Sequence, residues 1–275
     1  MGILQYSFFQ NAILGSLLAS IVCGFIGTYI VTRRLVFISG GITHASFGGI
    51  GLGVFLGTNP ILSAMVFAVL SALGVQWMSH RGDVREDSAI ALFWTFGMSI
   101  GIICCFLTPG FMPNLPSYLF GSILTISKSD LWLLGGVTIF VILLFAFFLR
   151  PIQSIAFDSS FARSQHLPVT FMENIMMALI AITIVSTLRL VGIILAISLL
   201  TIPQMSANLF TYCWKKMILL SILIGWIDCL AGLVISYWLN VPSGASIIFT
   251  GILIYALLKS IKIMQRKRDI QKAEP

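Results

Sequence analysis

The chain is divided into nine long apolar runs by short loops that carry charge, glycine or proline. A helix of about 20 apolar residues spans the hydrocarbon core of a membrane. The alternating segments of about ten residues that mark a membrane β-barrel are absent. Charged residues make up only 9% of the chain, against about 25% in ordinary globular proteins. We therefore predict an all-α polytopic membrane protein with about nine transmembrane helices, within a range of about eight to ten. The predicted spans are residues 8–32, 35–56, 60–79, 88–107, 131–149, 171–188, 191–212, 217–239 and 246–264.

The basic residues predict how these spans are oriented. With the N-terminus outside, nearly all Lys and Arg fall in loops on one face, and only Lys128 and Arg189 fall on the other. Cytoplasmic loops carry such an excess, so we expect the C-terminus in the cytoplasm. The net charge of +7 then faces anionic membrane lipid, and no nucleic-acid partner is expected. Residues 1–275 are predicted to form one transmembrane domain, with a cytoplasmic loop at 150–170 and a basic cytoplasmic tail at 265–275.

The chain has no room for a nucleotide-binding domain. Its longest polar stretches are the 150–170 loop and the tail, and it contains no G-x-x-x-x-G-K-[ST] motif. If ATP drives this protein, the ATPase is another chain.

The second predicted span carries a histidine on a face of glycines. Gly40, Gly41, Gly48 and Gly51 lie within about 60° of His44 on a helical wheel. Such a face allows another helix to approach closely, or it opens a polar cavity. His44 then either braces two helices or lines a transport path together with Thr43, since ionisable groups within a membrane are candidates for function. A neutral imidazole is a good ligand for zinc, iron and nickel.

Two further spans carry buried polar residues. Thr201, Gln204 and Asn208 form a polar stripe on the seventh predicted span, where Pro203 is expected to bend the helix. This pattern favours a cavity lining or a gating kink over plain packing. Asp228 lies midway along the eighth predicted span, where a carboxylate is costly unless it is paired or protonated. It either pairs with another helix or lines a polar path.

The cytoplasmic loops contain a short amphipathic segment at residues 157–168. It predicts either an interfacial helix or a docking element for a soluble partner. His80 and His166 sit at loop edges with charged neighbours, so both are predicted to be solvated.

The chain resembles the membrane permease subunits of ABC transporters for manganese, zinc and iron, over roughly residues 8–262. The matching pieces follow the order of that family. They are Arg33 and Arg34 with the Gly-Gly-x-x-His-Ala-x-x-Gly-Gly stretch around His44, the segment 85–92, Tyr118 with Gly121, Phe157 and Asp158 with Ala162, Val191 and Gly192 with Leu200 and Pro203, and Pro242 with Gly244.

The resemblance implies a subunit without enzymatic activity, placed in a bacterial or archaeal plasma membrane. It implies a homodimer or a pair of related permeases, cytoplasmic ATP-binding subunits and an extracytoplasmic metal-binding protein. Asp158, Phe161 and Ala162 would couple to the ATPase. No tightly bound cofactor is expected, and the cargo is a divalent metal ion, with zinc the first expectation and manganese or iron the others.

Many members of that family carry an acidic residue one helical turn before the histidine, where this chain has Gly40. The coupling segment of the family also often has glycine at the position of His166. The alternative function is a secondary transporter or channel for a divalent cation, which would need no ATPase. An intramembrane enzyme is disfavoured because no catalytic base accompanies Ser246.

Overall fold

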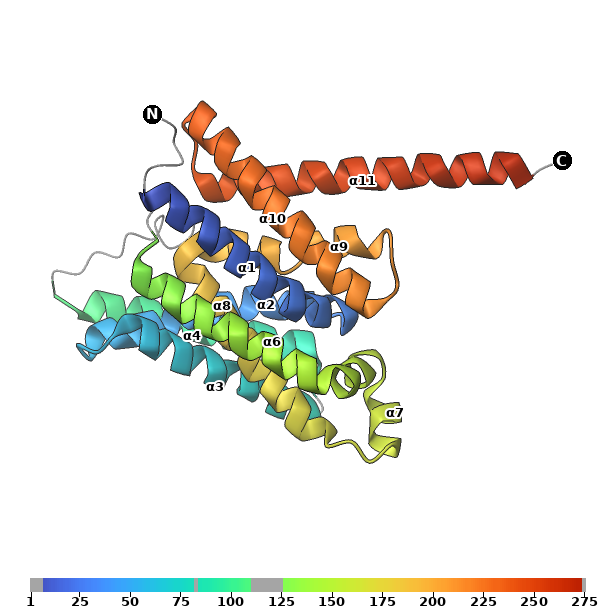
Figure 1. Ribbon diagram of the computed structural model, residues 1–275. Helices are drawn as coiled ribbons and strands as arrows, with labels where there is room; N and C mark the ends of the chain where they lie inside the picture. The colour runs from blue at the N-terminus through green and yellow to red at the C-terminus, as the bar shows by residue number, and fades with distance from the viewer. Residues whose placement is uncertain (1–6, 82–83, 110–125, 274–275) are drawn as a thin grey trace.

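The computed structural model describes residues 7–81, 84–109 and 126–273, and all regular secondary structure within them is helical. Figure 1 shows these helices packed side by side. Their bounds are α1 Ser7–Thr32, α2 Val36–Phe55, α3 Pro60–Arg81, α4 Glu86–Leu107, α6 Lys128–Phe157, α7 Ser159–Ser164, α8 Val169–Leu199, α9 Ile202–Asn208, α10 Trp214–Leu239 and α11 Ser243–Ala273.

The prediction of a polytopic helical membrane protein is confirmed, but the count of nine long spans is not. Within the described residues, seven helices are long and apolar enough to cross a membrane. They are α1, α3, α4, α6, the Val169–Leu188 part of α8, α10 and α11. The other two predicted spans correspond to the glycine-rich α2 and to a broken segment, Gly192–Asn208. Tyr118 and Gly121, which contribute to the family resemblance, lie outside the described residues.

The predicted span at 191–212 is not one helix with a proline bend. The chain first breaks at Gly192, whose φ of 75° and ψ of 172° are accessible almost only to glycine. It breaks again at Leu200 and Thr201, and α9 begins after them with Pro203 in its first turn. A proline in the first turn of a helix removes no hydrogen bond that the helix needs. Pro203 therefore starts a short helix here, and the glycine makes the sharper break.

α8 lies at the centre of the molecule, where it contacts α1, α2, α3, α6 and α11. α1 packs against α6, α8, α9 and α10, while α2 packs against α3, α4 and α8. Figure 1 shows the ends of α1, α3 and α6 on the same side as α7 and the start of α10. We call this side the basic end, because it carries Arg33, Arg81, Arg150, Lys215 and Lys216.

Two helices at the periphery have distinctive ends. α6 is kinked at Phe148, whose φ and ψ are −115° and 21°, because Pro151 cannot continue the hydrogen-bond ladder. α11 continues to Ala273 and so carries most of the predicted basic tail as helix. Figure 1 shows α11 extending past the other helices toward the C-terminus.

Candidate functional site

His44 lies half-buried on α2, and its ring stacks on an aromatic residue of α4. The imidazole is 4.5 Å from the Trp94 ring centroid, with an angle of 3° between the planes. Phe37 meets the same tryptophan at 5.8 Å. The stack fixes the plane of the imidazole. Trp94 was missed by the sequence analysis, because an aromatic residue in an apolar span carries no signal of its partner.

The glycines of α2 differ in how closely other helices approach them. A Cβ added at Gly48 would lie 2.6 Å from the carbonyl oxygen of Gly97, and one at Gly51 would lie 2.5 Å from that of Gly101. These glycines let the backbones of α2 and α4 touch, as small residues do in membrane helix pairs. Gly40 is different, because its Cβ would meet only the Ile197 side chain, at 3.8 Å. The space beside His44 is therefore at the Gly40 side, one turn toward the basic end.

Thr43, the residue before His44, forms a side-chain hydrogen bond within α2. Thr43 is buried and donates a hydrogen bond to the carbonyl of Ser39. Its oxygen can still accept, so a role in a path stays a prediction.

Gln204 is the polar residue of α9 that meets α1. Gln204 is completely buried and donates from Nε2 to the carbonyl oxygens of Cys23 at 2.8 Å and Leu199 at 3.1 Å. Its Oε1 atom is buried without a hydrogen-bond partner. Thr201 donates to the Ile197 carbonyl at 2.9 Å, and Asn208 is exposed at the end of α9. Gln204 therefore anchors α9 to α1, and the three residues do not form one continuous stripe, because Thr201 precedes the helix.

Asp228 is 2% exposed on α10, and its Oδ1 atom has no hydrogen-bond partner. Its carboxylate faces α11, where a Cβ added at Gly251 would lie 3.2 Å from Oδ2. Within the described part of the chain, no salt bridge involves it. A polar path beside Asp228 stays a prediction.

A buried ion-pair cluster at the basic end was not anticipated. Glu173 of α8 is 1% exposed and accepts from Arg33 Nη2 at 2.9 Å. Its other oxygen lies 3.0 Å from His80 Nε2 and 3.2 Å from Gln76 Nε2. The cluster thus joins the ends of α1, α3 and the beginning of α8.

His80 is exposed, as predicted, but it belongs to the last turn of α3 and its Nε2 lies 3.0 Å from a carboxylate oxygen of Glu173. His166 is exposed, as predicted. Its φ of 57° is the left-handed conformation that glycine adopts most easily. That conformation explains why a glycine would suit this position at the end of α7.

The segment 157–168 folds around the short helix α7. Asp158 caps this helix, because its Oδ1 accepts from the backbone nitrogens of Ser160 at 2.9 Å and Phe161 at 3.0 Å. Ala162 is fully buried in a small cluster with Ile155 of α6 and with Val169 and Met172 of α8. Phe161 is 56% exposed and is not part of that cluster. Asp158 and Ala162 therefore position α7, and Phe161 is the side chain presented to the outside.

Metal-binding chemistry in the described residues is sparse. No group of three or more His, Cys, Asp or Glu among them lies close enough to hold a metal ion. A closed structural metal site is therefore not built from those residues, whereas a transported ion needs only weak, exchangeable ligands.

The sequence profile of the ABC 3 transport family matches residues 5–262. The chain is 41% identical over 254 residues to an uncharacterised membrane protein of Synechocystis, covering 92% of this chain and 90% of the relative. It is 32% identical over 255 residues to the manganese transport system membrane protein MntC of Halalkalibacterium halodurans, covering 93% and 87%. The solved structure of PsaBC from Streptococcus pneumoniae in complex with Fab matches with a TM-score of 0.83 and 29% identity, covering 94% of this chain and 92% of that one.

The fold and these likenesses define the class of the molecule as a multi-pass membrane permease of an ABC-type metal transporter, which fits a bacterial plasma membrane. The chain belongs to the ABC 3 transport family. The resemblance noted from the motifs is thereby confirmed. The preference for zinc is not supported, because the named relatives are manganese permeases.

Proposed function

We propose that this chain is the permease subunit of an ATP-driven importer of manganese. The observation that carries the proposal is the likeness to manganese permeases along more than nine-tenths of the chain. Because the described residues contain no Walker A motif, cytoplasmic ATP-binding subunits would supply the energy. An extracytoplasmic metal-binding protein would deliver the ion, and two permease subunits would enclose the path. The basic end would face the cytoplasm, with the N-terminus outside.

His44 is the proposed ion contact in the path. It is half-buried, its ring plane is fixed by Trp94, and its neighbour Gly40 leaves space one turn away. One imidazole from each of two subunits, completed by water or carbonyl oxygens, gives a ligand set that can release the ion. Manganese accepts such oxygen ligands readily.

We expect that His44→Ala lowers the initial rate of manganese uptake by at least about tenfold, because even outer-shell changes cost about 10–100-fold in metal affinity. Uptake of radioactive manganese, zinc and iron is measured in a deletion strain that carries each variant at matched membrane levels. The control is Tyr212→Ala, because Tyr212 is 92% exposed in the loop after α9 and should leave uptake unchanged. Near-normal uptake by both His44→Ala and His44→Gln would show that the histidine only braces α2 and α4. Faster uptake of zinc than manganese by the wild type would overturn the choice of ion.

The loop at residues 150–170 is the proposed coupling element. α7 is seated against the ends of α6 and α8 through Ala162, and it presents Phe161 outward. An exposed aromatic side chain on a rigidly seated helix is suited to fill a pocket of a partner protein. Movement of a bound ATPase would then be passed through α7 to α6 and α8.

We expect Phe161→Ser to reduce ATP hydrolysis by the assembled transporter to its unstimulated rate, because the side chain that fills the partner's pocket is removed. Hydrolysis is measured in proteoliposomes with and without the metal-loaded binding protein. Ser164→Ala, on the same short helix, is the matched control and should retain stimulation. Full stimulation of the Phe161→Ser transporter would place the docking surface elsewhere.

A further inference from the structure

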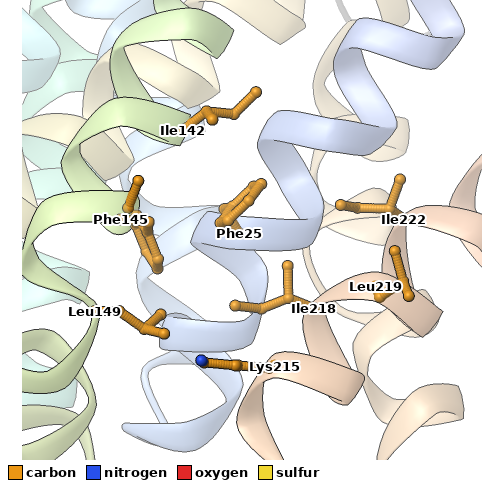
Figure 2. A pocket seen from close by; sticks show the side chains of 9 residues that line it. Phe25, Ile142, Phe145, Leu149, Lys215, Ile218, Leu219 and Ile222 are labelled. Carbon is orange, nitrogen blue, oxygen red and sulfur yellow. The ribbon is translucent and has the colours of Figure 1, made fainter.

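An open apolar groove of about 380 Å³ runs between α1, α6 and α10. Eight of its nine lining residues are apolar, and they include Phe25 of α1, Leu149 of α6 and Ile222 of α10. The ninth is Lys215, in the first turn of α10. Figure 2 shows Lys215 at one end of the groove, with its nitrogen directed across toward Leu149. The groove is thus apolar along its length and positively charged at one end.

The walls of this groove are fixed by aromatic contacts. Phe25 and Phe145 meet edge to face with ring centroids 5.1 Å apart, and Phe145 stacks on Trp214 at 6.0 Å. Trp214 in turn donates from Nε1 to Thr32 Oγ1 at 3.0 Å, which holds the start of α10 beside the end of α1. The kink of α6 at Phe148 lies next to Leu149. The groove is therefore preformed and ends at the level where the helices reach the basic end.

The charge at that end is not neutralised by the protein. Lys215, Lys216 and Arg150 are exposed there, and none of them takes part in a salt bridge among the described residues. No carboxylate lines the groove. Lys215 differs from its two neighbours because it alone lines the groove.

We propose that this groove binds an anionic phospholipid of the cytoplasmic leaflet, with one acyl chain along Phe25 and Ile222 and the phosphate on Lys215. Acyl chains are as apolar as the groove, so apolar contact alone selects no lipid. The charge of the headgroup therefore determines which lipid binds, since basic pockets between transmembrane helices on the cytoplasmic side favour anionic headgroups. The inference uses the proposed orientation of the basic end, but it does not depend on the identity of the transported ion.

The test measures lipid retained by the full-length chain. Wild type and variants are purified into detergent micelles that contain equal amounts of phosphatidylglycerol and phosphatidylethanolamine, and retained lipid is counted by mass spectrometry. The wild type is expected to retain phosphatidylglycerol preferentially. Lys215→Gln should reduce that retention about fivefold. This is the change in binding expected when one basic residue is removed from beside an anionic headgroup. Lys216→Gln is the matched control, because this neighbour is equally exposed but does not line the groove.

A second variant tests the groove without changing its charge. Ala146 lines the groove and is exposed, so Ala146→Phe should fill the space for the acyl chain and displace the lipid while Lys215 stays in place. Equal retention of the two lipids by the wild type, or equal loss in the two lysine variants, would overturn the proposal. Displacement of phosphatidylglycerol by inorganic phosphate, but not by chloride at the same ionic strength, would also overturn it, because the site would then bind free phosphate.

Discussion

Glu173→Ala is expected to destabilise the permease by about 3–5 kcal/mol, the usual cost of removing one partner of a buried ion pair. Glu173 is 1% exposed and meets Arg33, His80 and Gln76. Without the carboxylate, the Arg33 guanidinium remains partly buried, and its Nε atom already has no hydrogen-bond partner. The ends of α1, α3 and α8 lose their common contact, so thermal unfolding of the purified protein should begin at a much lower temperature.

An exposed ion pair provides the control for this prediction. Arg85 and Asp87 are 3.8 Å apart with side chains 86% and 71% exposed. Solvated pairs of this kind contribute little, so Asp87→Ala should unfold like the wild type. Arg33→Ala and the double variant with Glu173→Ala complete a double-mutant cycle that measures the pair itself. Unfolding of Glu173→Ala at the wild-type temperature would show that the cluster does not stabilise the bundle.

Gly48→Leu is expected to prevent normal assembly of α2 with α4, whereas Gly40→Leu should leave the fold intact. The added Cβ at Gly48 would lie 2.6 Å from the carbonyl oxygen and 2.9 Å from the Cα atom of Gly97. Backbone atoms cannot rotate away, so the helices must separate, and even Gly48→Ala should cost about 1–3 kcal/mol. Among the described residues, a Cβ added at Gly40 would meet only the flexible end of the Ile197 side chain, at 3.8 Å. Size-exclusion profiles and thermal unfolding of the two variants compare these positions directly.

The Gly48→Leu and Gly40→Leu variants also distinguish an effect on helix packing from an effect on transport. The sequence left open whether the glycine face of α2 packs against another helix or lines a polar cavity. The structure puts the backbone of α4 against Gly48, so a loss of uptake there would report misassembly. Gly40→Leu that folds normally but takes up little manganese would support a path beside His44. Normal uptake by that variant would contradict a path on this side of α2.

The sequence by itself determined the class of the fold and most helix ends. Apolar runs of about 20 residues have one stable structure in a membrane, because every backbone polar group must be paired within the helix. The predicted ends at residues 32, 107 and 239 coincide with the last residues of α1, α4 and α10. Family motifs added the permease assignment, which the comparisons confirmed. The predicted number of long spans was wrong at two places. The glycines of α2 lower its hydropathy, and Gly192 breaks the helix in the segment 191–212.

Only the tertiary structure decided which side chains act together. Arg33 and Glu173 are 140 positions apart, and Gln76 and Glu173 are 97 apart, so no local pattern connects them. His80 is exposed, as its charged sequence neighbours suggest, but they do not predict that a carboxylate from α8 reaches it. Helical periodicity predicts the face on which a residue lies, but it does not predict which helix covers that face. Gly48 and Gly40 share one face of α2, and only the position of α4 makes one a tight contact and leaves the other open.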